Sequence, residues 1–202
     1  MLGNMQAESG LHANIAQRGM TKLSDAQYTA AADNGLLDFA RDSVGYGLCQ
    51  WTYPARKAAL LAFAREKGVS VGDEAMQVKY CLAELTTGGG EYTDLWRQLC
   101  SSHDLFALTQ AVCTKYERPA HNNVGTRYEY ALAFAELAAR AFDGEDEDET
   151  PAADACTIVQ PSVMLLQLAM QQDGYWPDKA DGIKSEAFRV AFDEYASDVL
   201  KC

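Results

Sequence analysis

Glu8 is the carboxylate whose sequence surroundings best suit acid–base chemistry. It lies at the carboxyl end of a short helix predicted over residues 2–9, which Gly10 closes. The negative end of the helix dipole and partly apolar neighbours disfavour an ionised carboxylate there. A carboxylic acid that keeps its proton near neutral pH is what general-acid cleavage of a glycosidic bond requires. The plain alternative is a solvated glutamate at a helix end.

A second candidate segment runs from Val44 to Thr52 and contains two glycines. Glycine lets the backbone approach a ligand closely. Gln50 offers hydrogen-bond donors and an acceptor. Tyr46 and Trp51 offer flat faces on which a sugar ring could stack. The alternative is a tight turn that buries the two aromatic rings.

Composition limits the classes of function that the chain can serve. The 202 residues are 48% apolar, which suffices for one sizeable domain and a small second unit. The net charge of −12 disfavours general nucleic-acid binding, where phosphate contacts supply most of the affinity. No apolar run approaches the roughly 18 residues of a membrane span. Residues 1–10 lack the basic start of a signal peptide, so none is expected.

The elements that must position these residues are mostly helices. Ser24 and Gln27 form a capping-box pattern at the start of one helix, and residues 36–52 have no helical period. Pro54 suits the first turn of a helix, and Asp73 can cap the next. Helices are predicted over residues 54–67, from 73 to before 87, over 92–101, 104–117 and 124–142. The last should face inward through Ala131, Leu132, Ala135, Leu137 and Ala138.

The six cysteines form no Cys-x-x-Cys pair, so a zinc site is not predicted. No His-Glu-x-x-His pattern is present either, so no metal is expected. Reduced thiols are the expectation, and disulfides stay an open alternative. The residues are Cys49, Cys81, Cys100, Cys113, Cys156 and Cys202.

An acidic run divides the chain into two units. Residues 143–158 include six acidic side chains within a short stretch, which should repel one another and form a solvated linker. Residues 1–142 then form the larger domain. Residues 159–202 form a small helical unit, with helices predicted over 161–172 and 184–200.

The two chemical segments belong to a set of motifs that resembles the phage tail lysozyme family. That family lies within the lysozyme-like and lytic transglycosylase superfamily. The resemblance covers residues 1–142, and the motifs follow one another in the family's order. They are Gly3-Asn4, Glu8-Ser9-Gly10, Gln17-Arg18-Gly19, Gly45 to Thr52, and Glu117-Arg118-Pro119.

The resemblance implies a mainly α, lysozyme-like α+β fold with a small loop or β region, whose first helix would be truncated here. It also implies cleavage of the peptidoglycan β-1,4 bond between N-acetylmuramic acid and N-acetylglucosamine. Glu8 would be the catalytic acid, and no cofactor is implied. Expected partners are peptidoglycan and phage tail proteins, at a phage tail or at the cell wall after release. The expected substrate-binding residues are Ser9, Gln17, Tyr46, Gly47, Gln50, Trp51 and Glu117.

The second carboxylate of a hydrolysing enzyme is open at this point. An inverting enzyme needs it roughly 6.5–9.5 Å from the acid, across a water. Asp42, just before the glycine-rich segment, is the first choice, and Asp38 and Glu117 are alternatives. A lytic transglycosylase needs no such base, because the substrate's own 6-hydroxyl attacks and leaves an anhydro-muramic end. Arg118 is expected to pair with Glu117 and order the cleft wall.

Two other classes of function remain as alternatives. Cys49 with a distant histidine, His103 or His121, could form a cell-wall peptidase. A tail or wall-binding protein could keep the fold without catalysis, although intact Glu8 and Gln50 argue against such a loss.

The unit over residues 159–202 resembles the three-helix peptidoglycan-binding repeat. Ser185 and Asp193 depart from that repeat's usual glycine and glutamine. The alternative is a helical unit that packs on the larger domain or on a partner. The matching residues are Val163, Leu166, Gln167, Gly174, Tyr175, Asp181, Gly182, Ile183, Ala187, Phe188 and Phe192.

Overall fold

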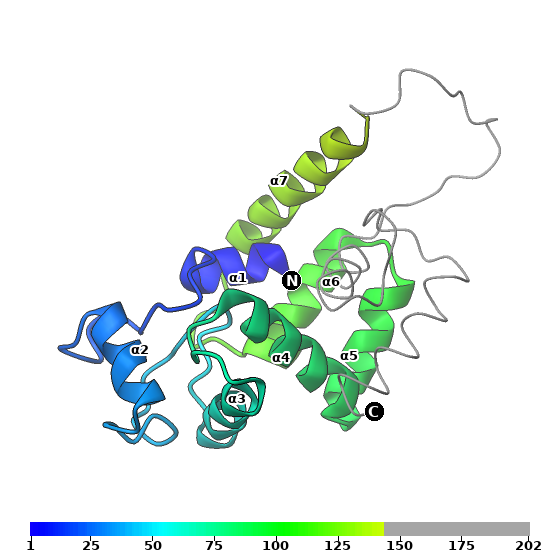
Figure 1. Ribbon diagram of the computed structural model, residues 1–202. Helices are drawn as coiled ribbons and strands as arrows, with labels where there is room; N and C mark the ends of the chain where they lie inside the picture. The colour runs from blue at the N-terminus through cyan, green and yellow to red at the C-terminus, as the bar shows by residue number, and fades with distance from the viewer. Residues whose placement is uncertain (144–202) are drawn as a thin grey trace.

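The computed structural model describes residues 1–143, which are mainly helical (Figure 1). The acidic linker and the unit over residues 159–202 lie outside the described residues, apart from the linker's first position. No helix in the described part is long and apolar enough to cross a membrane. The helices are α1 (Leu2–Ser9), α2 (Asp25–Asp33), α3 (Pro54–Lys67), α4 (Glu74–Thr87), α5 (Gly90–Ser101), α6 (Leu105–Ala111), the π-helical η1 (Val112–Glu117) and α7 (Val124–Asp143).

Local signals set most helix ends where the sequence predicts them. Gly10 closes α1 in the left-handed conformation, with φ of 62°. The Ser24 capping box is present, since its side chain accepts from the Gln27 amide and the Gln27 side chain accepts from the Ser24 amide. Pro54 opens α3, and the Asp73 side chain accepts from the Met76 amide at the start of α4. These predictions are confirmed.

The predicted helix over residues 104–117 consists of an α-helix, α6, followed directly by a π-helix, η1. α6 ends at Ala111, and η1 continues with hydrogen bonds that span five residues, ending with the Arg118 amide donating to the Cys113 carbonyl at 2.8 Å. Arg118 itself is left-handed, with φ of 52°. A π-helical turn carries one extra residue per turn, so it rotates the side chains that follow it. Glu117 is the last residue of this turn.

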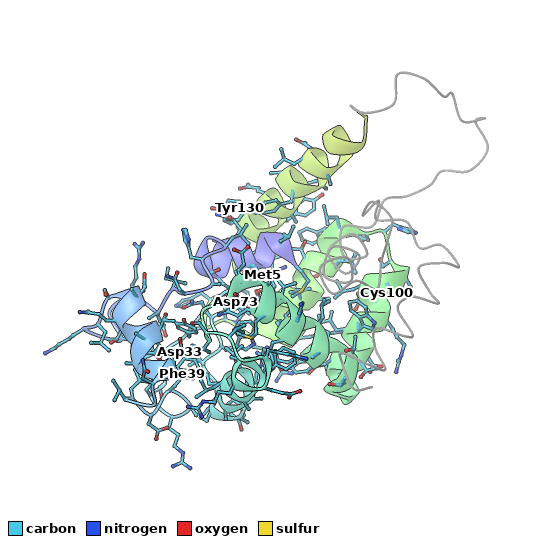
Figure 2. The ribbon with its side chains drawn as sticks, in the orientation of Figure 1. Met5, Asp33, Phe39, Asp73, Cys100 and Tyr130 are labelled. Carbon is cyan, nitrogen blue, oxygen red and sulfur yellow. The ribbon has the colours of Figure 1, made fainter. Side chains whose placement is uncertain are left out.

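The prediction that α7 faces inward is confirmed for Ala131 and wrong for Leu132 and Leu137. Ala131 is buried, but Leu132 and Leu137 are 38% and 59% exposed. The reason is length: the 8 residues of α1, which packs on α7, span about 12 Å, whereas the 20 residues of α7 span about 30 Å. Figure 1 shows α7 running past the end of α1. Figure 2 shows Met5 on α1 and Tyr130 on the part of α7 that lies near α1.

Helices α1 and α7 touch backbone to backbone at Gly3. A Cβ atom added to Gly3 would lie 2.5 Å from both the Arg127 carbonyl oxygen and the Ala131 nitrogen of α7. Asn4, the next residue, is fully buried and its Nδ2 donates to the Thr109 carbonyl of α6 at 3.3 Å. The Gly3-Asn4 motif therefore fixes α1 against two other helices.

The loops before α2 and α3 lie side by side and brace each other. The Gln17 amide donates to the Gly45 carbonyl at 2.7 Å, and the Gly47 amide donates to the Ile15 carbonyl at 2.9 Å. Tyr46 forms isolated antiparallel bridges with Ala16 and Trp51. Within residues 1–143 these bridges are the extent of the predicted β region.

The buried amide of Gln77 on α4 fastens these loops to the helices. Its Nε2 donates to the carbonyls of Ala13 and Val71, both at 2.7 Å, and its Oε1 accepts from the Leu48 amide at 2.9 Å. A Cβ at Gly47, where φ is 74°, would lie 2.4 Å from the Gln77 side chain. Glycine is therefore needed at position 47 for space as well as for its backbone angle.

We expect Gly3→Ala to destabilise the protein by roughly 1–3 kcal/mol, because the added methyl group meets backbone atoms that cannot rotate away. Chemical denaturation followed by circular dichroism measures this change. Gly125→Ala in α7 is the matched control, since its added Cβ meets nothing within 4 Å. An unchanged midpoint for Gly3→Ala would show that α1 can shift away from α7 at little cost.

Candidate active site

An open cleft of about 1810 Å³ lies between the end of α1, the two bracing loops and the helices α3, α4 and η1. Its lining includes five of the predicted site residues. They are Glu8, Ser9, Gln17, Gln50 and Glu117.

Glu8 stands in the last turn of α1, with its side chain 16% exposed. Its neighbour Ser9 is buried, and Ser9 Oγ lies 2.9 Å from the Met5 carbonyl and 3.0 Å from the Leu48 carbonyl. Ser9 thus joins the end of α1 to the Val44–Thr52 segment. This contact explains why the two segments share one cleft.

Arg127 of α7 holds two carboxylates with one guanidinium group. Its Nη2 donates to Glu8, and its Nη1 donates to Glu117 at 2.6 Å and to the Asn4 carbonyl at 3.3 Å. The Arg127 and Glu117 side chains are only 5% and 1% exposed. This arrangement places a buried cation beneath the cleft wall, with the more exposed Glu8 facing the cleft.

The sequence predictions missed Arg127. Within α7 it looks like an ordinary surface arginine, because nothing near it in sequence marks it as buried. The one available signal was Gly3, since a glycine inside a short helix suggests close approach of another backbone. The helix that approaches Gly3 is the one that carries Arg127.

Glu117 is a buried carboxyl group at the end of η1. Burial, followed by the nearby Glu8 carboxylate, raises the pKa of Glu117 from its ordinary 4.5 to about 8, against the opposing effect of Arg127. The expected Glu117–Arg118 pair is wrong. Arg118 turns away in its left-handed conformation and pairs with exposed Glu91, so Arg127 is the partner of Glu117.

Gln50 and Gln17 line the cleft and also hold its loops in place. Gln50 has a φ of 46°, and its Nε2 donates to the Gly47 carbonyl at 3.0 Å. The Gln17 Oε1 atom accepts from the Gly45 amide at 3.1 Å.

Tyr46, Gly47 and Trp51 do not line the cleft, so the structure corrects their expected role in holding sugar. Tyr46 is fully buried, and its ring packs edge-on against Phe39 at 5.2 Å. Trp51 is 1% exposed, and Gly47 faces Gln77. The physical reason is that a short, tightly turned segment must bury its large rings to hold its shape.

Trp51 instead orients a charged cluster in the cleft floor. Its Nε1 donates to Glu84 Oε2 at 2.9 Å, and Arg56 donates to the same carboxylate through Nε and Nη2, both at 2.7 Å. The hydroxyl groups of Tyr116 and Tyr80 also donate to Glu84, at 2.5 and 3.1 Å. With its oxygens occupied, Glu84 serves to position Arg56 rather than to move protons.

The cleft does offer aromatic faces, at positions that the sequence predictions missed. Tyr53 is 68% exposed at the cleft edge, directly before α3. Tyr92 and Phe63 also line the cleft and are half-buried. Tyr53 directly follows the Val44–Thr52 motif, and its exposure could not be read from residue type.

Asp42, the first choice for a second carboxylate, lies outside the cleft lining and is fully engaged. It accepts from Lys57 Nζ at 2.5 Å, from the Val44 amide at 3.0 Å and from the Tyr28 hydroxyl. Lys57 is completely buried, so it needs Asp42 as its counter-ion. This correction follows from a lysine whose burial the sequence pattern did not reveal. Asp38 is exposed and likewise outside the lining.

Cys49 lines the cleft but is poorly suited to act as a nucleophile. Burial and then the neighbouring Cys81 raise the pKa of its thiol well above the ordinary value. His12 is the histidine in the cleft lining, and within residues 1–143 no hydrogen bond joins Cys49 to a histidine side chain. In the same residues no group of His, Cys, Asp and Glu side chains could hold a metal ion.

Comparison with known proteins gives one match. Residues 1–137 match a family model described as phage tail lysozyme. That span contains α1, the bracing loops and the three residues Glu8, Glu117 and Arg127. No curated protein and no solved structure matches the chain significantly.

We expect the contribution of Glu117 to the stability of the protein to fall as pH rises from about 4.5 to about 8. In that window the folded chain keeps a proton on Glu117 that the unfolded chain releases, so the folded state binds more protons. Glu117→Gln should flatten this slope by up to about 1.4 kcal/mol per pH unit. Urea denaturation at pH 5, 6.5 and 8 measures it. Identical slopes in both proteins would contradict a buried, protonated Glu117.

Proposed function

Since the chain belongs to the phage tail lysozyme family, which implies a peptidoglycan-lytic enzyme, we propose that it cleaves the β-1,4 bond between N-acetylmuramic acid and N-acetylglucosamine. Glu8 is the general acid that protonates the glycosidic oxygen. The observation that carries this proposal is the position of Glu8, at a helix end on the wall of an open cleft of about 1810 Å³.

The rest of the cleft supports the binding of a glycan strand. Gln17 and Gln50 line the same cleft as Glu8, and amide side chains are suited to sugar hydroxyls and acetamido groups. Tyr53 offers an exposed face at the cleft edge for stacking. Ser9 joins α1 to the Val44–Thr52 segment, and Gly47 leaves space for the Gln77 side chain that fastens that segment to α4.

A second candidate is a lytic transglycosylase, and the state of the second carboxylate favours it. Asp42 is bound by Lys57 and lies outside the cleft, and Asp38 is outside it as well. Glu117 lines the cleft but is 1% exposed, which leaves little access for an attacking water. A transglycosylase needs no such carboxylate, because the muramic 6-hydroxyl attacks the sugar.

We also propose that residues 159–202 bind the cell wall, with residues 143–158 as a tether. The support is the motif resemblance of the C-terminal unit and the acidic character of the segment before it. A tether of this kind raises the local concentration of an insoluble substrate without new catalytic contacts. Action at the cell wall, as part of a phage tail or after release, fits this arrangement.

Glu8→Gln should abolish glycan cleavage and leave folding and sacculus binding unchanged, because the amide keeps the shape of the side chain and cannot donate the proton. Mass spectrometry of fragments released from purified sacculi measures this. Muramic reducing ends in the wild-type digest would indicate a hydrolase, and anhydro-muramic ends a transglycosylase.

Glu74→Gln is the matched control for that experiment. Glu74 is exposed at the start of α4 and lies outside the cleft lining, so its variant should cleave as the wild type does. Undiminished cleavage by Glu8→Gln would reject Glu8 as the acid. Released peptides in place of glycan fragments would point to the Cys49 peptidase.

Deletion of residues 156–202 should weaken sacculus binding more than it slows cleavage of short soluble glycans, since the described cleft lies entirely within residues 1–143. Co-sedimentation with sacculi and a soluble-glycan assay measure the two effects side by side. An equal loss in both assays would indicate that the deleted unit supports folding rather than wall binding.

A further inference from the structure

Two carboxylates share one guanidinium group beneath the cleft wall. Arg127 contacts Glu8 through Nη2 and Glu117 through Nη1. If both carboxylates were ionised, two anions would contact one guanidinium group in a site where Glu117 is 1% exposed, with the Met1 amino group and Arg56 as the further nearby cations. Burial and the like charge of Glu8 therefore favour the protonated form of Glu117, the more buried of the two carboxyl groups.

Unpartnered polar atoms mark the same place. Within residues 1–143, the buried side-chain atoms without a hydrogen-bond partner are Asn4 Oδ1, Glu117 Oε1 and Arg127 Nε. All three belong to the residues that surround this guanidinium group, since the Asn4 carbonyl also accepts from Arg127. Buried polar atoms are almost always partnered, so three exceptions around one guanidinium group call for an explanation.

We propose that Glu117 stores the proton that Glu8 delivers, and that Arg127 exchanges its carboxylate partner as the proton moves. The proposal rests on the proposed function, in which Glu8 is the acid. Glu117 is suited to the storing role because it is the more buried of the two carboxyl groups, at 1% against 16% exposure. Glu117 is thus a positioning residue that acts through Glu8.

The proposed step moves one proton from Glu117 to Glu8 and then to the glycosidic oxygen. With the cleft empty, Arg127 pairs with the Glu8 carboxylate while Glu117 is a neutral acid. When a glycan occupies the cleft it desolvates Glu8, the more exposed partner, and so favours the neutral form there. The Glu117 O–H bond breaks, an O–H bond forms on Glu8, and Arg127 pairs with the new Glu117 carboxylate. Glu8 then gives that proton to the glycosidic oxygen.

The charged and titratable groups around Glu117 come from several elements. The Glu8 carboxylate of α1 favours a protonated Glu117. Arg127 of α7, Arg56 of α3 and the amino group of Met1 oppose it. The remaining neighbours, the thiols of Cys49 before α3 and Cys113 in η1, are held neutral by burial, which raises the pKa of each.

Two measurements on the full chain test the proposal. Infrared difference spectroscopy across a pH titration should detect one protonated carboxyl group at pH 7 in the wild type. Glu117→Gln should remove that signal, and Glu8→Gln should shift its titration to lower pH, because Arg127 then balances Glu117 alone. Absence of the signal in the wild type would overturn the proposal, whether or not the protein cleaves glycan.

The second measurement is the pH profile of kcat/KM on a soluble glycan. In Glu117→Gln the pH above which kcat/KM declines should be lower than in the wild type. Activity at pH 7.5 relative to pH 5.5 should then fall on the order of tenfold for each pH unit of this decrease. Loss by the same factor at every pH would mean that Glu117 is merely structural and would overturn the proposal. Glu117→Asp keeps a titratable carboxyl group and should retain the wild-type shape.

Two controls complete the design. Glu74→Gln removes an exposed carboxylate at the start of α4, outside the cleft lining, and should leave the profile unchanged. Circular dichroism checks that each variant folds. If Glu117→Gln fails to fold, the Glu117→Asp profile and the wild-type infrared titration still decide the question. Retained cleavage by Glu8→Gln would reject the proposed function instead, a result separate from the infrared signal.

Discussion

The close contact between α1 and α7 is the constraint on which the rest of the site depends. Gly3 lets the two backbones meet, and this contact brings Arg127 within reach of both Glu8 and Glu117. A larger residue at position 3 would separate the helices and leave a buried guanidinium group without its partners, a costly state. One residue without a side chain therefore governs the electrostatics of the cleft wall.

The main role of the Val44–Thr52 segment is to hold the shape of the cleft wall, since most of its large side chains do not face the cleft. Its large rings are buried, and its backbone is bonded to the neighbouring loop and to the Gln77 amide. Buried polar groups that are fully hydrogen-bonded rigidify a loop and specify a single conformation. A rigid loop of this kind holds Gln50 at a fixed place in the cleft that Glu8 also lines, which is the arrangement that preorganised binding requires.

Carboxylates in this protein take different roles according to their cationic partners. Asp42 neutralises buried Lys57, Glu84 orients Arg56, and Glu8 shares Arg127 with Glu117. Partners that occupy every oxygen, as around Glu84, fix a carboxylate as a structural group. Glu8 also lines the cleft, but within the described residues Arg127 donates to one of its oxygens, Oε1, so the carboxyl group is less fully engaged than that of Glu84.

The sequence by itself determined the helical class, most helix ends, the motif order and the position of Glu8 at a helix end. These features depend on caps, glycines and spacing, which act within a few residues. Only the tertiary structure decided which cation each carboxylate meets, that Tyr53 rather than Tyr46 or Trp51 is exposed, and how far α7 is covered. Such outcomes depend on contacts between distant segments, as with Glu8 and Arg127, which lie 119 positions apart. No local pattern encodes that pairing, because burial and ion-pair geometry arise only when the helices pack.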